Sequence, residues 1–144
     1  MDTTQRQLKE LSYGESLELL GTVPVGRIVF SLRALPAVRV VNHVVDEGAV
    51  IIRSHEGAAI VPAVGAGPGA VVAYEADALD EHRRLGWSVV VTGVASLVDD
   101  PVAIERYGAI LHPWVLGRMD QVIRIDPHLV TGFRLVPVGD GACL

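Results

Sequence analysis

The chain has 144 residues, of which 50% are hydrophobic and 20% charged, with a net charge of −5. This length suits one compact domain and is too short for two ordinary ones. An acidic chain with no basic stripe does not favour nucleic-acid binding, and its apolar runs fall short of the roughly 20 residues that a membrane helix needs. The mean hydropathy of +0.40 instead suits a homodimer with a large apolar interface.

Residues 1–7 lack the apolar centre of a signal peptide, so we expect none at the N-terminus. The single cysteine, Cys143, cannot form an internal disulfide. No histidines or acidic residues show metal-ligand spacing, so no metal site is predicted. We therefore expect a cytoplasmic protein with an N-terminal tail over 1–10, one domain over 11–137 and a C-terminal tail over 138–144.

The first half of the chain predicts one helix followed by strands. Ser12 and Glu15 have capping-box spacing at the start of a helix over Gly14–Leu20. Asp46-Glu-Gly48 is typical of a hairpin turn. Residues rich in β-branched side chains predict strands on both sides of that turn: Gly26–Leu32, Ala37–Val45 and Ala49–Arg53.

The second half predicts two further helices and three strand regions. An aspartate directly before Pro101 is a helix-start signal for a helix that ends near Leu111. Gly93 is the expected kink in a long strand. The remaining predictions, in chain order, are a helix over Gly57–Val64, a turn over Gly65–Gly69, a strand over Ala70–Glu75, a polar loop over Asp77–Arg84, a strand over Trp87–Val98, and a last strand over Gln121–Arg124 that Asp126-Pro127 breaks and that resumes over Val130–Val136.

The order of these elements predicts a mainly β fold. Six strand segments without regular alternation of strand and helix argue against a Rossmann sheet. A closed antiparallel barrel with short helices fits better, because closure leaves no exposed edge on so many apolar strands.

Five short segments in this order carry a family resemblance: Val25–Ile28, Val40–Asp46, Ile52–Ser54, Gly86–Val89 and Val122–Pro127. Together they resemble the pyridoxamine-phosphate-oxidase-like flavin proteins over most of the chain, from about Leu11 to Leu135. The resemblance implies an FMN-binding split β-barrel, antiparallel and Greek-key-like, with FMN at the interface of a homodimer. The set is more specific for the fold than for the reaction.

Arg53 and Ser54 are the candidate phosphate ligands. A guanidinium binds a phosphate through two parallel hydrogen bonds, and the resemblance implies phosphate contacts at both positions. The alternative is an arginine in solvent at a strand end with a serine capping the next helix. Ala58-Ala59 stands where relatives carry a lysine, and this missing charge should weaken FMN binding or indicate another flavin-like cofactor.

The remaining candidate cofactor residues come from two other strands. The resemblance implies that Val40, Val41 and Asn42 contact the edge of the flavin ring, largely through the backbone; Asn42 can equally bond to a neighbouring turn. It also implies that Trp87 and Ser88 reach the flavin, often from the partner subunit, although a tryptophan at the start of a strand is also ordinary core.

The function implied is that of an FMN-dependent oxidoreductase acting on an unknown small electron acceptor or donor. No catalytic side chain is assigned, because the cofactor carries the electron chemistry. One alternative is a deazaflavin-dependent reductase, since alanine- and valine-rich composition with little lysine is typical of actinobacterial genomes, where deazaflavin relatives occur. Another is a dimer that binds a flavin or other small ligand without turnover. The segment His112–Trp114 is interpreted as packing, with a place beside the substrate opening as the alternative.

Overall fold

The computed structural model describes residues 5–54, 60–65, 68–112, 114 and 121–138. Its elements, in chain order, are β1 (Arg6–Glu10), α1 (Tyr13–Leu20), β2 (Val25–Leu32), β3 (Leu35–Asp46), β4 (Ala49–Ser54), α2 (Ile60–Gly65), β5 (Ala70–Asp80), β6 (Leu85–Leu97), α3 (Pro101–Ile110) and β7 (Gln121–Pro137). No helix in these ranges is long and apolar enough to cross a membrane.

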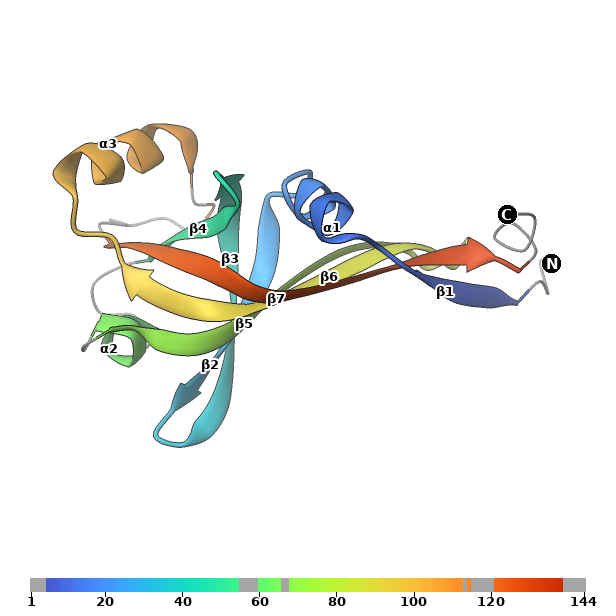
Figure 1. Cartoon of the computed structure of the whole chain (residues 1–144), viewed down its shortest axis with the longest axis horizontal. Coiled ribbons are helices and arrows are strands. Elements are labelled where there is room, and N and C mark those ends of the chain that lie inside the picture. The colour runs from blue at the N-terminus through green and yellow to red at the C-terminus, as the bar shows by residue number, and fades with distance from the viewer. Residues whose placement is uncertain (1–4, 55–59, 66–67, 113, 115–120, 139–144) are drawn as a thin grey trace.

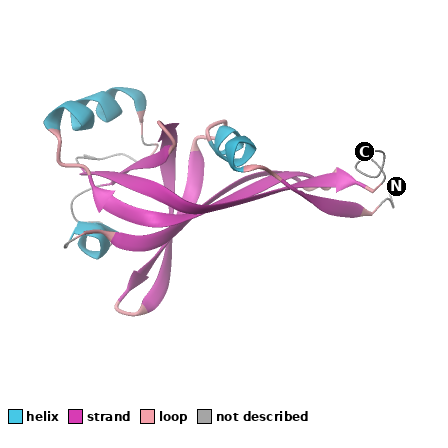
Figure 2. Cartoon of the chain, in the orientation of Figure 1, coloured by secondary structure: helices cyan, strands magenta, loops and turns pink. Residues whose placement is uncertain are grey.

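Six of the strands close into an antiparallel barrel (Figures 1 and 2). The hydrogen-bonded order is β1-β7-β4-β3-β2-β5-β6, and β6 also pairs with β7, which joins the two ends of the six-strand series from β7 to β6. This confirms the mainly β, antiparallel barrel with short helices that the strand pattern predicts. The capping box is also present, because Ser12 accepts from the backbone of Glu15 and the Glu15 carboxylate accepts from the backbone of Ser12.

The strand β7 runs unbroken through Asp126 and Pro127, so the predicted break is wrong. The irregularity is instead a register shift: Thr92 of β6 pairs with Leu129, and the next residue, Gly93, pairs with Pro127. One extra residue on β7 at this point is a β-bulge, which bends a strand without ending it. A proline is tolerated at such a bulge because the ladder is already interrupted there.

Beyond the barrel, β5, β6, β7 and β1 continue as a long arm (Figure 1), in which the pair Arg6–Pro137 is the outermost of the β1–β7 ladder. The strand β5 extends to Asp80, past the predicted end at Glu75, because its pairing with β6 continues to Asp80 opposite Leu85. Arg6–Glu10, which the sequence places in a tail, pairs residue by residue with the end of β7. The polar sequence of β1 gives no strand signal, so only this tertiary pairing explains it.

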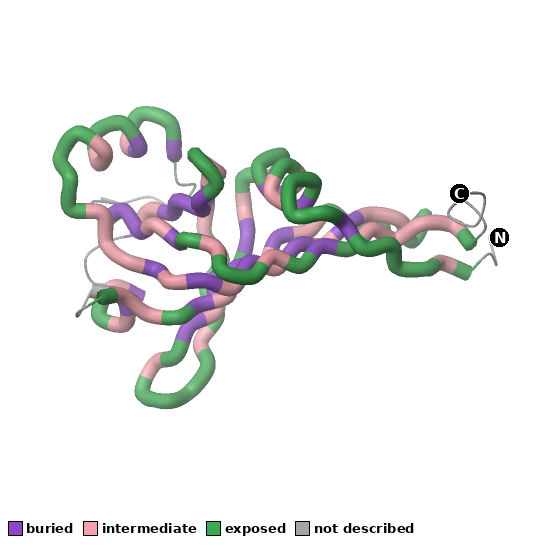
Figure 3. Tube along the Cα trace, in the orientation of Figure 1, coloured by how far each residue is buried: buried purple, intermediate pink, exposed green. Residues whose placement is uncertain are grey.

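The core fills the barrel and a smaller cluster outside it (Figure 3). The interior is lined by alternate residues of each strand, among them Ile28, Ile52, Val72, Val89 and Val91. The second cluster lies under α3, where Tyr107 and Leu111 pack on Ile51 and Val122. Strand β4 is therefore buried on both faces, which explains its continuous apolar sequence.

One polar network lies within the core. His43 is 3% exposed, and its Nε2 lies 2.8 Å from the carbonyl oxygen of Leu20, so Nε2–H must donate. Nδ1 then accepts from the hydroxyl of Tyr74 at 2.5 Å. These bonds select the neutral ring and tie the end of α1 to β3 and β5. Burial lowers the pKa of His43 from its ordinary value and raises the pKa of Tyr74.

The buried neutral histidine predicts acid-sensitive stability. The unfolded chain takes up a proton near the ordinary pKa of 6.5, whereas folded His43 resists protonation until lower pH. We therefore expect the free energy of unfolding to fall as pH drops below 6.5, by up to about 1.4 kcal/mol per pH unit from this residue. Urea unfolding of wild type and His43→Gln between pH 7.5 and 5 measures the slope. The variant should lose it, and the exposed-histidine control His82→Gln should keep it.

Candidate functional site

Two of the predicted cofactor residues stand one position beyond the end of the β3–β4 ladder. The hairpin of β3 and β4 turns at Glu47 and Gly48, and its ladder runs from Asp46 opposite Ala49 to His43 opposite Ile52. Asn42 and Arg53 occupy the next position on each strand. The predicted ring-edge residue and the predicted phosphate residue therefore share one end of this hairpin.

Arg53 is joined to the end of α3. Its Nη1 donates to the carbonyl oxygen of Leu111 at 2.9 Å, and Leu111 itself is buried in the cluster under the helix. The helix begins as the sequence predicts, with Asp100 as its cap and Pro101 in the first turn. Arg53 thus fixes the point at which the chain leaves α3.

A second contact holds α3 to the β3–β4 turn. The Asp46 carboxylate accepts from Arg106 at 2.6 Å and from the Tyr107 hydroxyl at 2.7 Å. Both hydrogen bonds lower the pKa of Asp46 below its ordinary range, and the bond from Arg106 has the larger effect. The helix is therefore fixed to the hairpin by Asp46 at one end of the ladder and by Arg53 at the other.

The segment that follows α3 returns to Asn42. The backbone N–H of Trp114 donates to Asn42 Oδ1 at 2.8 Å, and Asn42 Nδ2 donates to the carbonyl oxygen of Pro24 at 3.3 Å. Leu111 thus contacts Arg53, and Trp114 contacts Asn42, at the same end of the hairpin. We define the site as Asn42, Arg53, Leu111 and Trp114, together with the neighbouring residues Val40 and Val41.

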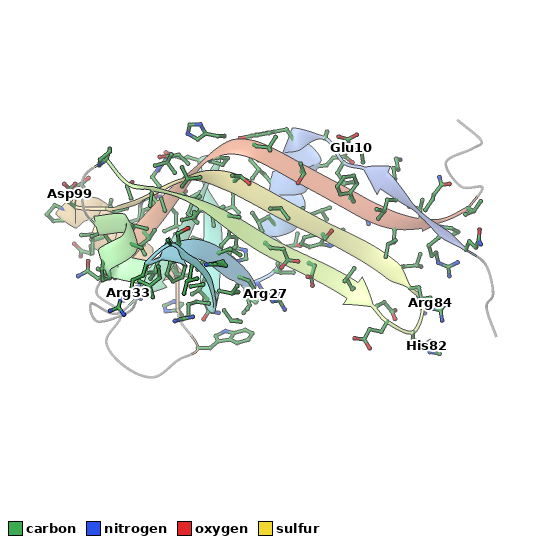
Figure 4. The ribbon with its side chains drawn as sticks, turned by 90° about the horizontal axis from the view of Figure 1, so that it is seen from below. Glu10, Arg27, Arg33, His82, Arg84 and Asp99 are labelled. Atoms are coloured by element: carbon green, nitrogen blue, oxygen red, sulfur yellow. The ribbon has the colours of Figure 1, made fainter. Side chains whose placement is uncertain are left out.

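The apolar part of the site lies on β3. Val40 is 65% exposed, whereas Val41, on the other face of the strand, packs against the core. Val40 pairs with Arg27 of β2 (labelled in Figure 4), and Arg27 forms ion pairs with Glu75 at 3.0 Å and Asp77 at 3.7 Å, both on β5. The outer face of the barrel therefore presents an exposed valine beside one cation and two carboxylates.

The other predicted phosphate residue, Ser54, is buried at the end of β4, 7% exposed. Consecutive residues of a strand point to opposite faces, so Arg53 and Ser54 do not present their side chains together. Residues 55–59, which include the start of the predicted helix and Ala58-Ala59, lie outside the described residues. In the described part of that helix, α2, Pro62 lies in the first turn, where a proline is tolerated.

Trp87 and Ser88 lie at the opposite end of the molecule, on the arm. Arg53 pairs with Val122 near the start of β7, whereas Ser88 pairs with Phe133. Eleven residues of strand separate these β7 partners, roughly 35 Å of contour length. One protomer therefore does not bring Ser88 to Arg53. Trp87 is 7% exposed and packs in the core, as its alternative interpretation states, and its flavin contact stays a prediction.

The family model of pyridoxamine 5'-phosphate oxidase matches residues 12–134 of this chain. The chain belongs to this family. Among its relatives is the uncharacterised protein Rv0080 of Mycobacterium tuberculosis, 52% identical over 133 residues, which cover 91% of this chain and 88% of that protein.

Solved structures of the pyridoxamine 5'-phosphate oxidase type share the fold. A Corynebacterium glutamicum protein that carries the family's name is 30% identical, with a TM-score of 0.76. The match covers 92% of this chain and 100% of that protein's chain. An FAD-binding protein from Mycobacterium smegmatis is also 30% identical, with a TM-score of 0.69, over 89% of this chain and 98% of its own. These matches confirm the split-barrel fold and the family resemblance.

The sequence gives no signal for Leu111 as a candidate site residue. From the sequence, the segment from His112 to Trp114 is interpreted as packing, with a place beside the substrate opening as the alternative; Trp114 is 72% exposed, which argues against packing. The available signal was an aromatic residue directly after the end of a predicted helix. Its link to Asn42 spans 72 residues of sequence and could not be inferred from that signal alone.

Proposed function

We propose that the protein is an FMN-dependent oxidoreductase that works as a homodimer, with each flavin bound between two protomers. The observation that supports the proposal is the end of the β3–β4 ladder, where Asn42, the predicted ring-edge residue, and the cation Arg53 each stand one position beyond the pair His43–Ile52. Membership of the family and the FAD-binding relative from M. smegmatis support a flavin as the ligand. The cytoplasmic location stays a prediction.

Arg53 is the proposed phosphate ligand. A guanidinium carries five N–H donors in a planar fork, so it can serve the Leu111 carbonyl and a phosphate oxygen together. Its position at a strand end, with the backbone of α3 already fixed beside it, means that little side-chain entropy remains to be lost on binding. FMN, FAD and deazaflavins all carry a phosphate, and Arg53 serves this shared group.

The strand β3 is the proposed ring site. Val40 offers an exposed apolar surface, and the backbone of Val41 and Asn42 offers donors and acceptors to the ring edge. The flavin, when bound, supplies the electron chemistry. The protein residues bind and orient it and exclude water from one side of the ring, so no acid or base side chain is assigned.

The second protomer is the proposed source of Ser88. Outward-facing positions of β5, β7 and β1 carry five exposed apolar side chains: Leu8, Val71, Leu79, Leu129 and Phe133. On β5 the same outward face also carries Glu75 and Asp77, so a partner chain would meet a mixed apolar and acidic face. Because Ser88 lies on this face and far from Arg53 in its own chain, a partner's arm is the proposed route by which Ser88 reaches the flavin.

Arg53→Ala tests the phosphate assignment. We expect the Kd for FMN to rise at least about tenfold, the loss of one charge-assisted hydrogen bond. Titration of apoprotein with FMN, followed by flavin fluorescence, measures the Kd. FAD and a deazaflavin cofactor titrated in parallel show which of the three binds most tightly. An unchanged Kd for all three in Arg53→Ala would refute the phosphate role.

The control for this experiment is Asp46→Asn. It weakens the other attachment of α3, to Arg106 and Tyr107, and leaves Arg53 in place. If Arg53→Ala acted only by loosening the helix, Asp46→Asn would raise the Kd equally. We expect Asp46→Asn to leave the Kd within about threefold of wild type, which is less than 1 kcal/mol.

A further inference from the structure

Trp114 combines a fixed backbone with an exposed side chain. Its backbone N–H is bonded to Asn42 Oδ1 at 2.8 Å, and Asn42 is itself bonded to Pro24. The side chain is nevertheless 72% exposed, the largest exposed fraction among the aromatic residues described as exposed. A tryptophan usually buries most of its surface. Here the backbone of Trp114 is fixed by a hydrogen bond while its indole remains largely unpacked.

The strand that holds Trp114 through Asn42 also carries an exposed apolar side chain. Val40 lies two residues from Asn42 on the same face of β3 and is itself 65% exposed. An indole presents a flat π surface, and aromatic rings stack on such surfaces with a gain beyond area burial. Beside Val40, Arg27 is ion-paired with Glu75 at 3.0 Å and with Asp77 at 3.7 Å, and Arg53 lies on the other strand of the hairpin. The apolar surface available to a ligand is therefore that of Val40 and the indole, bordered by charged groups.

We propose that Trp114 binds the planar, conjugated electron acceptor of the enzyme, and that Asn42 is the positioning residue that holds Trp114 beside the flavin. The inference rests on the proposed function, because it places the flavin ring edge at Val40–Asn42. Asn42 then contacts the flavin from β3 and Trp114 from the segment after α3. A second ring that enters from solvent meets the indole next to the flavin.

The test uses FMN-loaded protein and 1,4-naphthoquinone as the planar probe. Equilibrium dialysis measures the Kd of the quinone for the oxidised protein, without turnover. We expect Trp114→Leu to raise this Kd about fivefold, the value of one aromatic stacking contact, and Trp114→Phe to stay within about twofold. Asn42→Ala should raise it as Trp114→Leu does. With the bound FMN first reduced by one equivalent of dithionite, single-turnover reoxidation by the quinone, which takes two electrons and two protons to give the hydroquinone, should need about fivefold more quinone for its half-maximal rate in Trp114→Leu, with the limiting rate little changed. Reoxidation by ferricyanide, which is not a planar ring, should be unaltered.

Each remaining outcome separates this inference from the proposed function. If wild-type protein binds no flavin, the proposed function fails. If it binds FMN but not the quinone, or if Trp114→Leu leaves the quinone Kd unchanged, the acceptor site is overturned while flavin binding stands. If Trp114→Leu raises the Kd of FMN and not that of the quinone, the indole stacks on the flavin and the assignment to the acceptor is overturned.

Discussion

Gly93→Ala is expected to cost at least about 3 kcal/mol of folding free energy, at the upper end of overpacking effects. A Cβ at Gly93 would lie 2.0 Å from the carbonyl oxygen of Asp126 and 3.1 Å from the Cα of Pro127. Both atoms belong to the backbone of β7, which is also paired with β4 close by, at Ile125 opposite Val50. The strand cannot move away without opening the barrel.

Gly108→Ala is the matched control. Gly108 lies within α3, and a Cβ there would meet nothing within 4 Å. Alanine should therefore stabilise the helix by about 0.5–1 kcal/mol. Urea unfolding of both variants gives the comparison. A Gly93→Ala protein as stable as wild type would mean that the β6–β7 bulge does not close the barrel in the way described.

Two damaged protomers are expected to rebuild one intact flavin site when they are paired. In the proposed dimer each site takes Arg53 from one chain and Ser88 from the other. Homodimers of Arg53→Ala, and of Ser88→Asp, whose carboxylate would repel the phosphate, should each bind FMN at least about tenfold more weakly than wild type. A heterodimer of the two, isolated through different affinity tags, should bind one FMN per dimer with wild-type affinity.

The control pairs wild type with the double variant Arg53→Ala/Ser88→Asp. A shared site predicts that this heterodimer has no intact site, because every site contains one altered residue. A site formed within one chain predicts the reverse, namely one intact site here and none in the first heterodimer. Melting temperatures of all four proteins check folding, since Ser88→Asp places a carboxylate opposite Asp77. A purified wild-type protein that sediments as a monomer would also contradict the shared site.

Much of the fold follows from local sequence signals. The β-branched runs of β2, β3 and β4, the Ser12 capping box and the Asp100–Pro101 helix start are all present in the structure. The β3–β4 turn also sets the register of this hairpin, whose ladder ends at His43 opposite Ile52, one position before Asn42 and Arg53. These features depend on residues close together in the chain, which is why sequence patterns predict them.

What the sequence did not predict depends on contacts between distant segments. The strand β1 has a polar sequence and forms through pairing with β7. The sequence predicts a break at Asp126-Pro127, but β7 continues there. A proline donates no ladder hydrogen bond, and the bulge between the partners of Thr92 and Gly93 interrupts the ladder at this point. The bonds from Arg53 to Leu111 and from Trp114 to Asn42 join segments 58 and 72 residues apart. Local propensity carries no information about such pairs.

The bulge in β7 has a consequence for how the chain can change in length. Between the pairs Thr92–Leu129 and Gly93–Pro127, β7 contains one residue more than β6, and that residue is His128. Side chains alternate along a strand, yet Pro127 and Leu129, two residues apart, pair with consecutive residues of β6 and so face opposite sides. Deleting His128 would therefore restore strict alternation and leave Phe133 outward and Gly132 inward. Deleting a residue between Leu129 and Phe133 would instead turn Phe133 toward the interior, so the bulge is a place where β7 can lose a residue without exchanging the two faces of the arm.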